Sequence, residues 1–253
     1  MLKAGERWGV LTHGMLSSNL GISGSVFGAV RISPDAELFM GGGGRAQGNY
    51  KDANGNAIPN TFSDIGTATV KATFRPAEGH QVKLGFIDYD ATYNTGQPFP
   101  AGTPPPLASI YATRTQNQIA NGRWTYSRPD DRVFDFDGNI YWTRTSADQT
   151  KIGGTPAVDT GFIGDRRNFT INTYGVDVHN TSRFDIGPIR NAITYGADSF
   201  QDQVGTVGFN TVFTPSGERT VSGGFVQVKS NYETLLEVIG ALRYDRYSWR
   251  AVA

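Results

Sequence analysis

Segments of about ten residues in which apolar and polar side chains alternate recur along the sequence, and turn residues separate them. In residues 172–184, Tyr174, Val176 and Val178 alternate with a glycine, an aspartate and a histidine. Residues 132–143 and 81–86 show the same alternation. Successive residues of a β-strand point to opposite faces, so each segment predicts a strand with one apolar and one polar face.

Eleven such strands are predicted, and helical periodicity is almost absent. The expected ranges are 7–17, 22–32, 37–48, 63–75, 81–91, 109–126, 132–145, 170–184, 191–204, 221–230 and 234–248. The predicted fold class is therefore all-β, with neighbouring strands antiparallel.

The connections between these strands alternate between short and long. The short ones are residues 33–36, 76–80, 127–131, 185–190 and 231–233, and the long ones are 49–62, 92–108, 146–169 and 205–220; the first connection, 18–21, is also short. Successive connections of an up-and-down sheet lie at opposite ends, so one end carries tight turns and the other long loops. Bacterial outer-membrane barrels have this asymmetry, whereas soluble sandwiches usually mix loop lengths at both ends.

Aromatic residues near the predicted strand ends favour lipid as the solvent of the apolar face. An amphipathic ring suits the headgroup layer of a membrane. The residues expected in such a girdle are Trp8, Trp124, Tyr126, Tyr174, Tyr247 and Trp249. We therefore interpret the apolar face as the lipid-facing side of a transmembrane barrel.

Charge and cysteine content exclude several other classes of protein. Lysine plus arginine and aspartate plus glutamate both number 23, so no net field would steer nucleic acid toward the chain, and nucleic acid is not an expected partner. The sequence has no cysteine, which excludes disulfides and thiolate metal sites.

Five segments resemble, in the same order, parts of one protein family. They are MLKAGERWGV (1–10), GNYKDANGNAIPNT (48–61), NTYGVDVHNTSRFD (172–185), ITYGADSFQDQV (193–204) and LLEVIGALRYDRYS (235–248). They resemble the plug-to-barrel junction, the first long extracellular loop and successive barrel strands of TonB-dependent outer-membrane receptors of the haem/haemoglobin group.

The resemblance implies a fold and a function. Family members close a barrel of about 22 strands around an N-terminal plug domain. Residues 1–253 would then be one partial barrel domain, about half of the antiparallel up-and-down transmembrane barrel, without the plug. The chain would be a fragment of an active transporter for haem or another iron chelate in the outer membrane of a Gram-negative bacterium.

The resemblance also implies the partners and the transported ligand. Haem or a ferric chelate would be cargo, with no intrinsic cofactor. The expected partners are haem, a haemoprotein or a siderophore, the TonB complex acting through the absent plug domain, and outer-membrane lipid.

Histidines are the residues that best suit haem iron. The chain has three, His13, His80 and His179. His80 lies at the predicted periplasmic side, and His13 lies in the first strand. His179 belongs to a polar row and is predicted to point into the lumen, either as a haem ligand or as a side chain that bonds to the plug or to water. In the family the axial ligands lie in regions outside this sequence.

Three other motifs favour structural roles. Asp135 and Asp137 share one strand face about 7 Å apart, a spacing that could serve glycoside hydrolysis, but no nucleophile–base motif accompanies them. DANGN (52–56) lacks the sixth-position glycine of a calcium loop, and Ser63 stands where its glutamate belongs, so an Asx turn is expected. GGGG (41–44) has no following Lys-Ser/Thr and predicts close backbone approach in a strand. We predict no catalytic residue, no metal site and no enzyme activity.

Two alternatives remain open from the sequence. A passive porin-type channel would satisfy the same barrel pattern, and a plug-coding region beside this gene would argue against it. A soluble β-rich carbohydrate-binding protein would stay monomeric in buffer without detergent.

Overall fold

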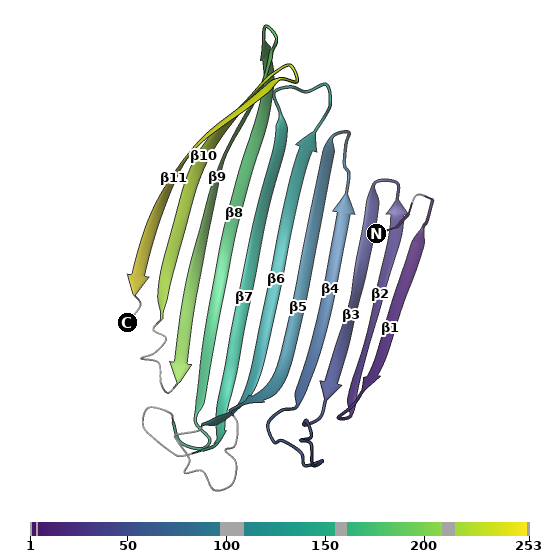
Figure 1. Cartoon of the computed structure of the whole chain (residues 1–253), viewed down its shortest axis with the longest axis vertical. Coiled ribbons are helices and arrows are strands. Elements are labelled where there is room, and N and C mark those ends of the chain that lie inside the picture. Colours follow the sequence, from purple (N-terminus) through teal and green to yellow (C-terminus); the bar gives the residue numbers. More distant parts are fainter. Residues whose placement is uncertain (1, 4, 97–108, 155–160, 209–215, 252–253) are drawn as a thin grey trace.

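The computed structural model describes residues 2–3, 5–96, 109–154, 161–208 and 216–251. These residues form one sheet of eleven antiparallel strands that follow one another in sequence order (Figure 1). The strands are β1 (Trp8–Ser17), β2 (Gly21–Ser33), β3 (Ala36–Gln47), β4 (Ser63–Phe74), β5 (His80–Thr95), β6 (Ile110–Ser127), β7 (Asp135–Gly153), β8 (Arg166–Ile186), β9 (Ile189–Gly208), β10 (Gly217–Tyr232) and β11 (Leu236–Ala251). The predicted all-β, up-and-down architecture is confirmed.

The two ends of the sheet differ as the connection lengths predict. The links β2–β3, β4–β5, β6–β7, β8–β9 and β10–β11 lie at one end, here called the short-turn end, and the longer connections lie at the other, the long-loop end (Figure 1). Ile186 pairs with Ile189 across a two-residue turn in which Gly187 takes a φ of 58°. A glycine with positive φ at the first turn position matches the right-handed twist of the flanking strands.

Two faces of the sheet follow from the register. Val82, Leu84 and Phe86 lie on one face, here called the outer face, together with the residues that pair with them. Asp137, Asp177 and Asp198 lie on the opposite, inner face. Each strand therefore carries an outer row and an inner row of side chains, as the alternation predicts.

The outer row of β5–β8 changes from apolar to polar at a single register. Phe86, Ala120, Trp142 and Tyr174 are successive cross-strand partners. Two residues further toward the long-loop end, the corresponding partners are Asp88, Gln118, Arg144 and Asn172. The boundary is therefore a line across four strands.

This boundary explains where the predicted strand limits are wrong. β7 continues to Gly153 rather than 145, β8 begins at Arg166 rather than 170, and β9 continues to Gly208 rather than 204. Beyond the boundary the outer row is polar, whereas the inner row of β8 carries Ile171 and Phe169, so the pattern of an apolar outer row and a polar inner row ends although backbone pairing continues. The predicted limits fall where the outer row loses its apolar residues.

The glycine run in β3 fits between closely spaced strands, as predicted. A Cβ on Gly42 would lie 2.5 Å from the Thr67 carbonyl oxygen, and one on Gly43 would lie 2.8 Å from the Gly24 carbonyl oxygen. Both obstacles are backbone atoms of neighbouring strands, so no side-chain movement would relieve them. Glycine is required here by close approach.

The aromatic girdle is only partly as predicted. Trp124 packs against Phe136 with ring centroids 5.0 Å apart, and Tyr126 lies 4.6 Å from His80 by the same measure, all on the outer face at the short-turn end. Tyr174 and Trp8 also occupy outer rows. Tyr247 and Trp249 do not, because the outer row of β11 holds the even-numbered residues and both pair with inner-row residues of β10.

The described sheet has no second layer to bury its outer face. Its only buried apolar residues are Ala91, Tyr111 and Val221, whereas Leu242 is 73% exposed and Ile140 63% exposed. A water-soluble sheet of this size would cover such an apolar surface with another layer. No helix of the described residues is long and apolar enough to span a bilayer.

Candidate functional site on the inner face

The inner rows of β6–β11 form a wall of paired charges. Arg123 forms an ion pair with Asp137, and the Asn139 side chain donates to Asp177 at 2.9 Å. Further along, Arg219 donates through Nε to Asp202 at 3.0 Å. These groups satisfy one another across neighbouring strands, so the wall presents a fixed polar surface.

Arg243 extends this network across three strands. Its guanidinium lies 2.8 Å from Asp198 of β9 and 2.7 Å from Asp245 of β11. The residue of β10 between the two carboxylates is Gly223, which is in register with both. Because glycine has no side chain, Arg243 can pass over β10, and an added Cβ there would collide with the Arg243 guanidinium.

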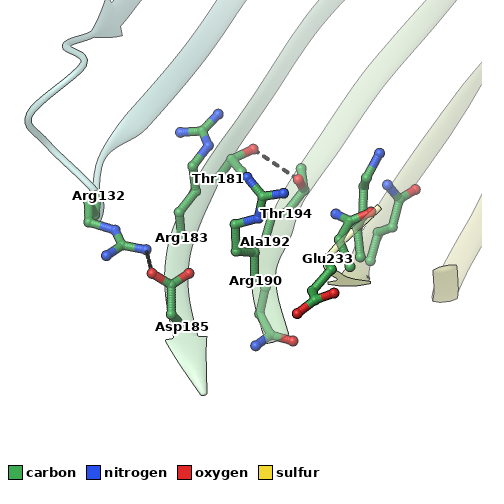
Figure 2. Close-up of a pocket in the computed structure, with 12 residues that line it drawn as sticks. Arg132, Thr181, Arg183, Asp185, Arg190, Ala192, Thr194 and Glu233 are labelled. Carbon is green, nitrogen blue, oxygen red and sulfur yellow. Dashed lines mark hydrogen bonds and ion pairs between the residues drawn. The ribbon is translucent and has the colours of Figure 1, made fainter. Parts of the chain in front are cut away.

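A charged hollow of about 690 Å³ lies on the inner face at the short-turn end. It is lined by Arg132, Thr181, Arg183, Asp185, Arg190, Asn191, Ala192, Thr194, Gln227, Lys229, Asn231 and Glu233 (Figure 2). The lining residues come from β8, β9, β10 and the adjoining turns.

Three of its four cations are already paired. Arg132 lies 2.7 Å from Asp185, Lys229 lies 2.6 Å from Glu237, and Arg183 forms an ion pair with Asp135. No ion pair of Arg190 occurs within the described part of the chain. Such an open, hydrogen-bonding surface suits contact with a polar polypeptide or hydrated solute, and it contains no nucleophile–base pair.

The three histidines lie apart. His179 is on the inner face, in register with Asp137 of β7 and Gly196 of β9, within the polar row to which the sequence assigns it. His13 is on the inner face of β1, opposite Ser25. His80 is on the outer face at the short-turn end, where its Nδ1 accepts a hydrogen bond from Trp124 Nε1 at 3.1 Å. A role of His179 as a haem ligand stays a prediction.

The other predicted motifs have structural roles. Asp135 and Asp137 are each held by an arginine, Arg183 and Arg123 respectively. Neither carboxylate is available as a free acid or base in this arrangement. Within the described ranges, no group of three or more His, Cys, Asp or Glu side chains is placed to hold a metal ion.

The first long loop is ordered by an Asx turn, as expected. Asp52 Oδ1 accepts the backbone N–H groups of Asn56 at 2.8 Å and Asn54 at 2.9 Å. Hydrogen bonds from the Asn56 backbone and side chain hold the pKa of Asp52 below its ordinary value. The carboxylate is thus occupied by its own loop rather than by a cation.

A basic cluster at the long-loop end was not predicted. Lys151 is fully buried and donates from Nζ to the Gly161 carbonyl oxygen at 2.7 Å. Arg167 stacks over the Tyr111 ring at 4.4 Å and donates through Nε to Gln149 at 2.7 Å. Lys151, Gln149 and Arg167 lie in strand segments for which the sequence predicts a loop, and Tyr111 lies near the end of a predicted strand. The alternation of side chains therefore did not reveal that these residues share the inner face.

Comparison with known proteins identifies the fold. No family model and no curated protein matches the chain by sequence. Among solved structures it is similar to the hemophore receptor HasR of Serratia marcescens, solved as a double mutant with its hemophore HasA and haem, with a TM-score of 0.76 and 20% identity. It is similar to the FrpB iron transporter of Neisseria meningitidis (F3-3 variant), with a TM-score of 0.75 and 16% identity, and to the copper transporter OprC, with 0.70 and 18%.

These matches cover 97% of this chain but only 34%, 41% and 37% of HasR, FrpB and OprC. The chain thus spans little more than a third of the length of the structures that it matches. Those neighbours are TonB-dependent receptors and transporters rather than enzymes. The eleven strands therefore have the fold of part of a TonB-dependent receptor barrel, the family that the sequence resembles.

Proposed function

We propose that this chain is part of the barrel of an outer-membrane active transporter that imports haem or another iron chelate. The observation that carries the proposal is the sheet itself, with an apolar band on its outer face, a polar wall on its inner face and strands in the order of a TonB-dependent receptor barrel. The solved neighbours named for haem and iron support an iron-containing cargo over the copper of OprC.

The exposed apolar band on the outer face, rather than its height, supports a membrane location. On β7 the band runs from Phe136 to Trp142 in the outer row. Six residues at about 3.3 Å each span about 20 Å along the strand, or about 15 Å along the membrane normal at a tilt of about 40°, against a lipid-facing band of roughly 25 Å in outer-membrane barrels. The inner wall would then line a lumen filled by water and by a plug domain, through which the TonB complex acts.

The two edges of the sheet support a larger barrel. In the described structure β1 pairs only with β2, and β11 pairs only with β10. Each unpaired backbone group in hydrocarbon costs several kcal/mol. We infer that residues 1–253 are a partial barrel domain whose edges are closed by further strands.

Uptake by the complete protein tests this proposal. Cells that express the barrel together with its plug should accumulate haem or a ferric siderophore, and collapse of the proton gradient should abolish this uptake. Copper uptake is the matched control. Permeation of small solutes that persists without the gradient would instead identify a passive porin-type channel and would contradict active transport.

A further inference from the structure

The limit of the outer apolar band shifts steadily from strand to strand. Trp142 of β7 is in register with Val70 of β4 and Ser248 of β11. The last outer-row residue before a charged one is Gly66 in β4, four residues beyond Val70 toward the long-loop end. In β11 it is Tyr244, four residues short of Ser248. From β4 to β11 the limit of the band therefore moves by about one residue per strand.

Such a drift is expected where a flat membrane surface crosses tilted strands. Closing a sheet into a barrel staggers the register of neighbouring strands. A shift of one residue, about 3.3 Å, for each strand spacing of about 4.8 Å corresponds to a tilt of about 35°, within the range of outer-membrane barrels. The limit of the band thus marks the level of the membrane surface on each strand.

The same drift places the membrane surface at the tip of the β1–β2 hairpin. Val10 of β1 is in the register of Trp142, six strands away. One residue per strand moves the limit six residues along β1 to Leu16, close to the hairpin turn. Leu16 and its partner Ile22 are 81% and 57% exposed on the outer face, and Leu20 in the turn is 92% exposed. These three side chains are here called the apolar tip.

Leu20 holds a backbone conformation that a bulky residue rarely adopts. Its φ is 56°, and it is the last residue of the turn between Ser17 and Gly21, a position that glycine usually fills. A Cβ on Gly48, which continues the outer row of β3, would lie 3.8 Å from the Cβ of Leu20, so the leucine lies toward the outer side of the sheet. Backbone strain of this kind is typical of residues whose side chains have a role.

The composition of the first hairpin matches a surrounding without water. Residues 9–30 contain no Asp, Glu, Lys or Arg, although these residues make up 18% of the chain. The connection between β3 and β4 differs, because its tip, DANGN (52–56), is polar and exposed. The first hairpin therefore lacks the kind of tip that would favour water.

We propose that the apolar tip inserts into the membrane leaflet at the long-loop end and anchors the β1–β2 hairpin among the acyl chains. The tip continues the outer apolar band with no charged residue between them, so lipid can cover both as one surface. Insertion of Leu20 removes its exposed side chain from water and offsets the strain of the turn. This inference rests on the proposed membrane location and is independent of the transported cargo.

Fluorescence quenching in vesicles tests this inference. The full chain, which has no cysteine, is labelled with bimane at Ser18→Cys and reconstituted in phosphatidylcholine vesicles with brominated acyl chains. Brominated lipid should quench this label more than aqueous iodide does, and a matched label at Asn54→Cys in the β3–β4 loop should show the reverse. Leu20→Asn keeps a residue that tolerates positive φ and should lower the ratio of lipid to iodide quenching at the first label about tenfold, the factor expected from burial of one leucine side chain.

Further variants separate insertion from misfolding and from other occupants. Leu20→Gly relieves the strain and should lower the ratio as Leu20→Asn does, whereas Ile58→Asn, which removes an exposed apolar side chain from the β3–β4 loop, should not. Equal effects of Leu20→Asn and Ile58→Asn would overturn the anchor. So would iodide quenching at Ser18→Cys as strong as at Asn54→Cys, or disulfide cross-links between the Ser18→Cys sites of two chains. A label at Val176→Cys that brominated lipid does not quench would instead overturn the proposed membrane location.

Discussion

Backbone spacing decides which residue can stand at position 42. A Cβ there would lie 2.5 Å from the carbonyl oxygen of Thr67, an atom that β4 holds in place. Gly66 of the neighbouring strand, also on the outer face, has no atom within 4 Å of the position that a Cβ would take. Both glycines lie in the same sheet, but only at position 42 does the neighbouring backbone leave no room for a larger residue.

Gly42→Ala should therefore destabilise the sheet by roughly 1–3 kcal/mol, because an overpacked methyl group forces the strands apart. Gly66→Ala is the matched control and should be neutral or slightly stabilising, since alanine costs less conformational entropy than glycine. Urea unfolding in micelles, followed by tryptophan fluorescence, measures both. Equal midpoints for the two variants would contradict the close approach.

Asp131 gives the β6–β7 turn a defined pH dependence. Its carboxylate accepts the N–H groups of Phe134 at 2.9 Å and Val133 at 3.0 Å, and the Tyr126 hydroxyl at 2.9 Å. These bonds lower the pKa of Asp131 below its ordinary value, and the bond from the Phe134 backbone has the largest effect. A lowered pKa means that the contribution to stability is complete above the unfolded pKa of about 3.9 and is lost as pH falls through the lower folded value.

The amide protons of Val133 and Phe134 should consequently stay protected from exchange at pH 5 to 7 and lose protection only below about pH 4. Asp131→Ala should remove both the protection and its pH dependence. Hydrogen exchange measured residue by residue provides the readout. Loss of protection in the wild-type turn at neutral pH would disagree with the role of Asp131.

Individual strands show how far the sequence predicts the fold. All eleven were located, because each has a stretch where an apolar outer row alternates with a polar inner row, as in Val82, Leu84 and Phe86. The long-loop ends of β5 and β7 to β11 were missed, because polar residues such as Asp148 and Asn168 occupy the outer row there. An apolar outer row alternating with a polar inner row is therefore the signal that locates a strand, and this signal ends where the outer row becomes polar.

The candidate site was less predictable than the strands. The position of His179 in the inner row followed from its place in the polar row of a single strand. The hollow around Arg190 joins residues of β8, β9 and β10 with the turn residue Arg132, so it depends on cross-strand register and on turn geometry. Periodicity within one strand carries neither kind of information.

Strands β9 to β11 offer a test of the inner wall as a unit. Gly223→Ala should displace the Arg243 guanidinium and uncouple Asp198 from Asp245, with a loss of roughly 1 kcal/mol from overpacking. Gly224→Ala, one residue along and on the outer face, meets only the Gly196 carbonyl oxygen at 3.6 Å and should have little effect. Protection of the β11 amides from hydrogen exchange should fall in Gly223→Ala and not in Gly224→Ala. A fall in Gly224→Ala alone would contradict the role of Arg243 in joining β9 to β11.

At the scale of the whole molecule, the sheet has two surfaces of opposite character and no second layer. The outer face exposes large apolar side chains such as Ile140 and Leu242, while the inner face carries ion pairs such as Arg123–Asp137 and Arg243–Asp198. Hydrocarbon outside and water with a polar plug inside satisfy both surfaces at once. The two open edges fit the same account, since a complete barrel leaves no strand unpaired.

The most direct test is a single-cysteine scan of β8 in lipid bilayers, for which the cysteine-free chain needs no background substitutions. Nitroxide labels at positions 173 to 179 are compared for collision with oxygen dissolved in lipid and with a water-soluble nickel chelate. Labels replacing Tyr174, Val176 and Val178 should collide with oxygen, and those replacing Thr173, Asp177 and His179 should collide with the nickel chelate. Equal access of the nickel chelate to both sets would contradict a lipid-facing outer surface.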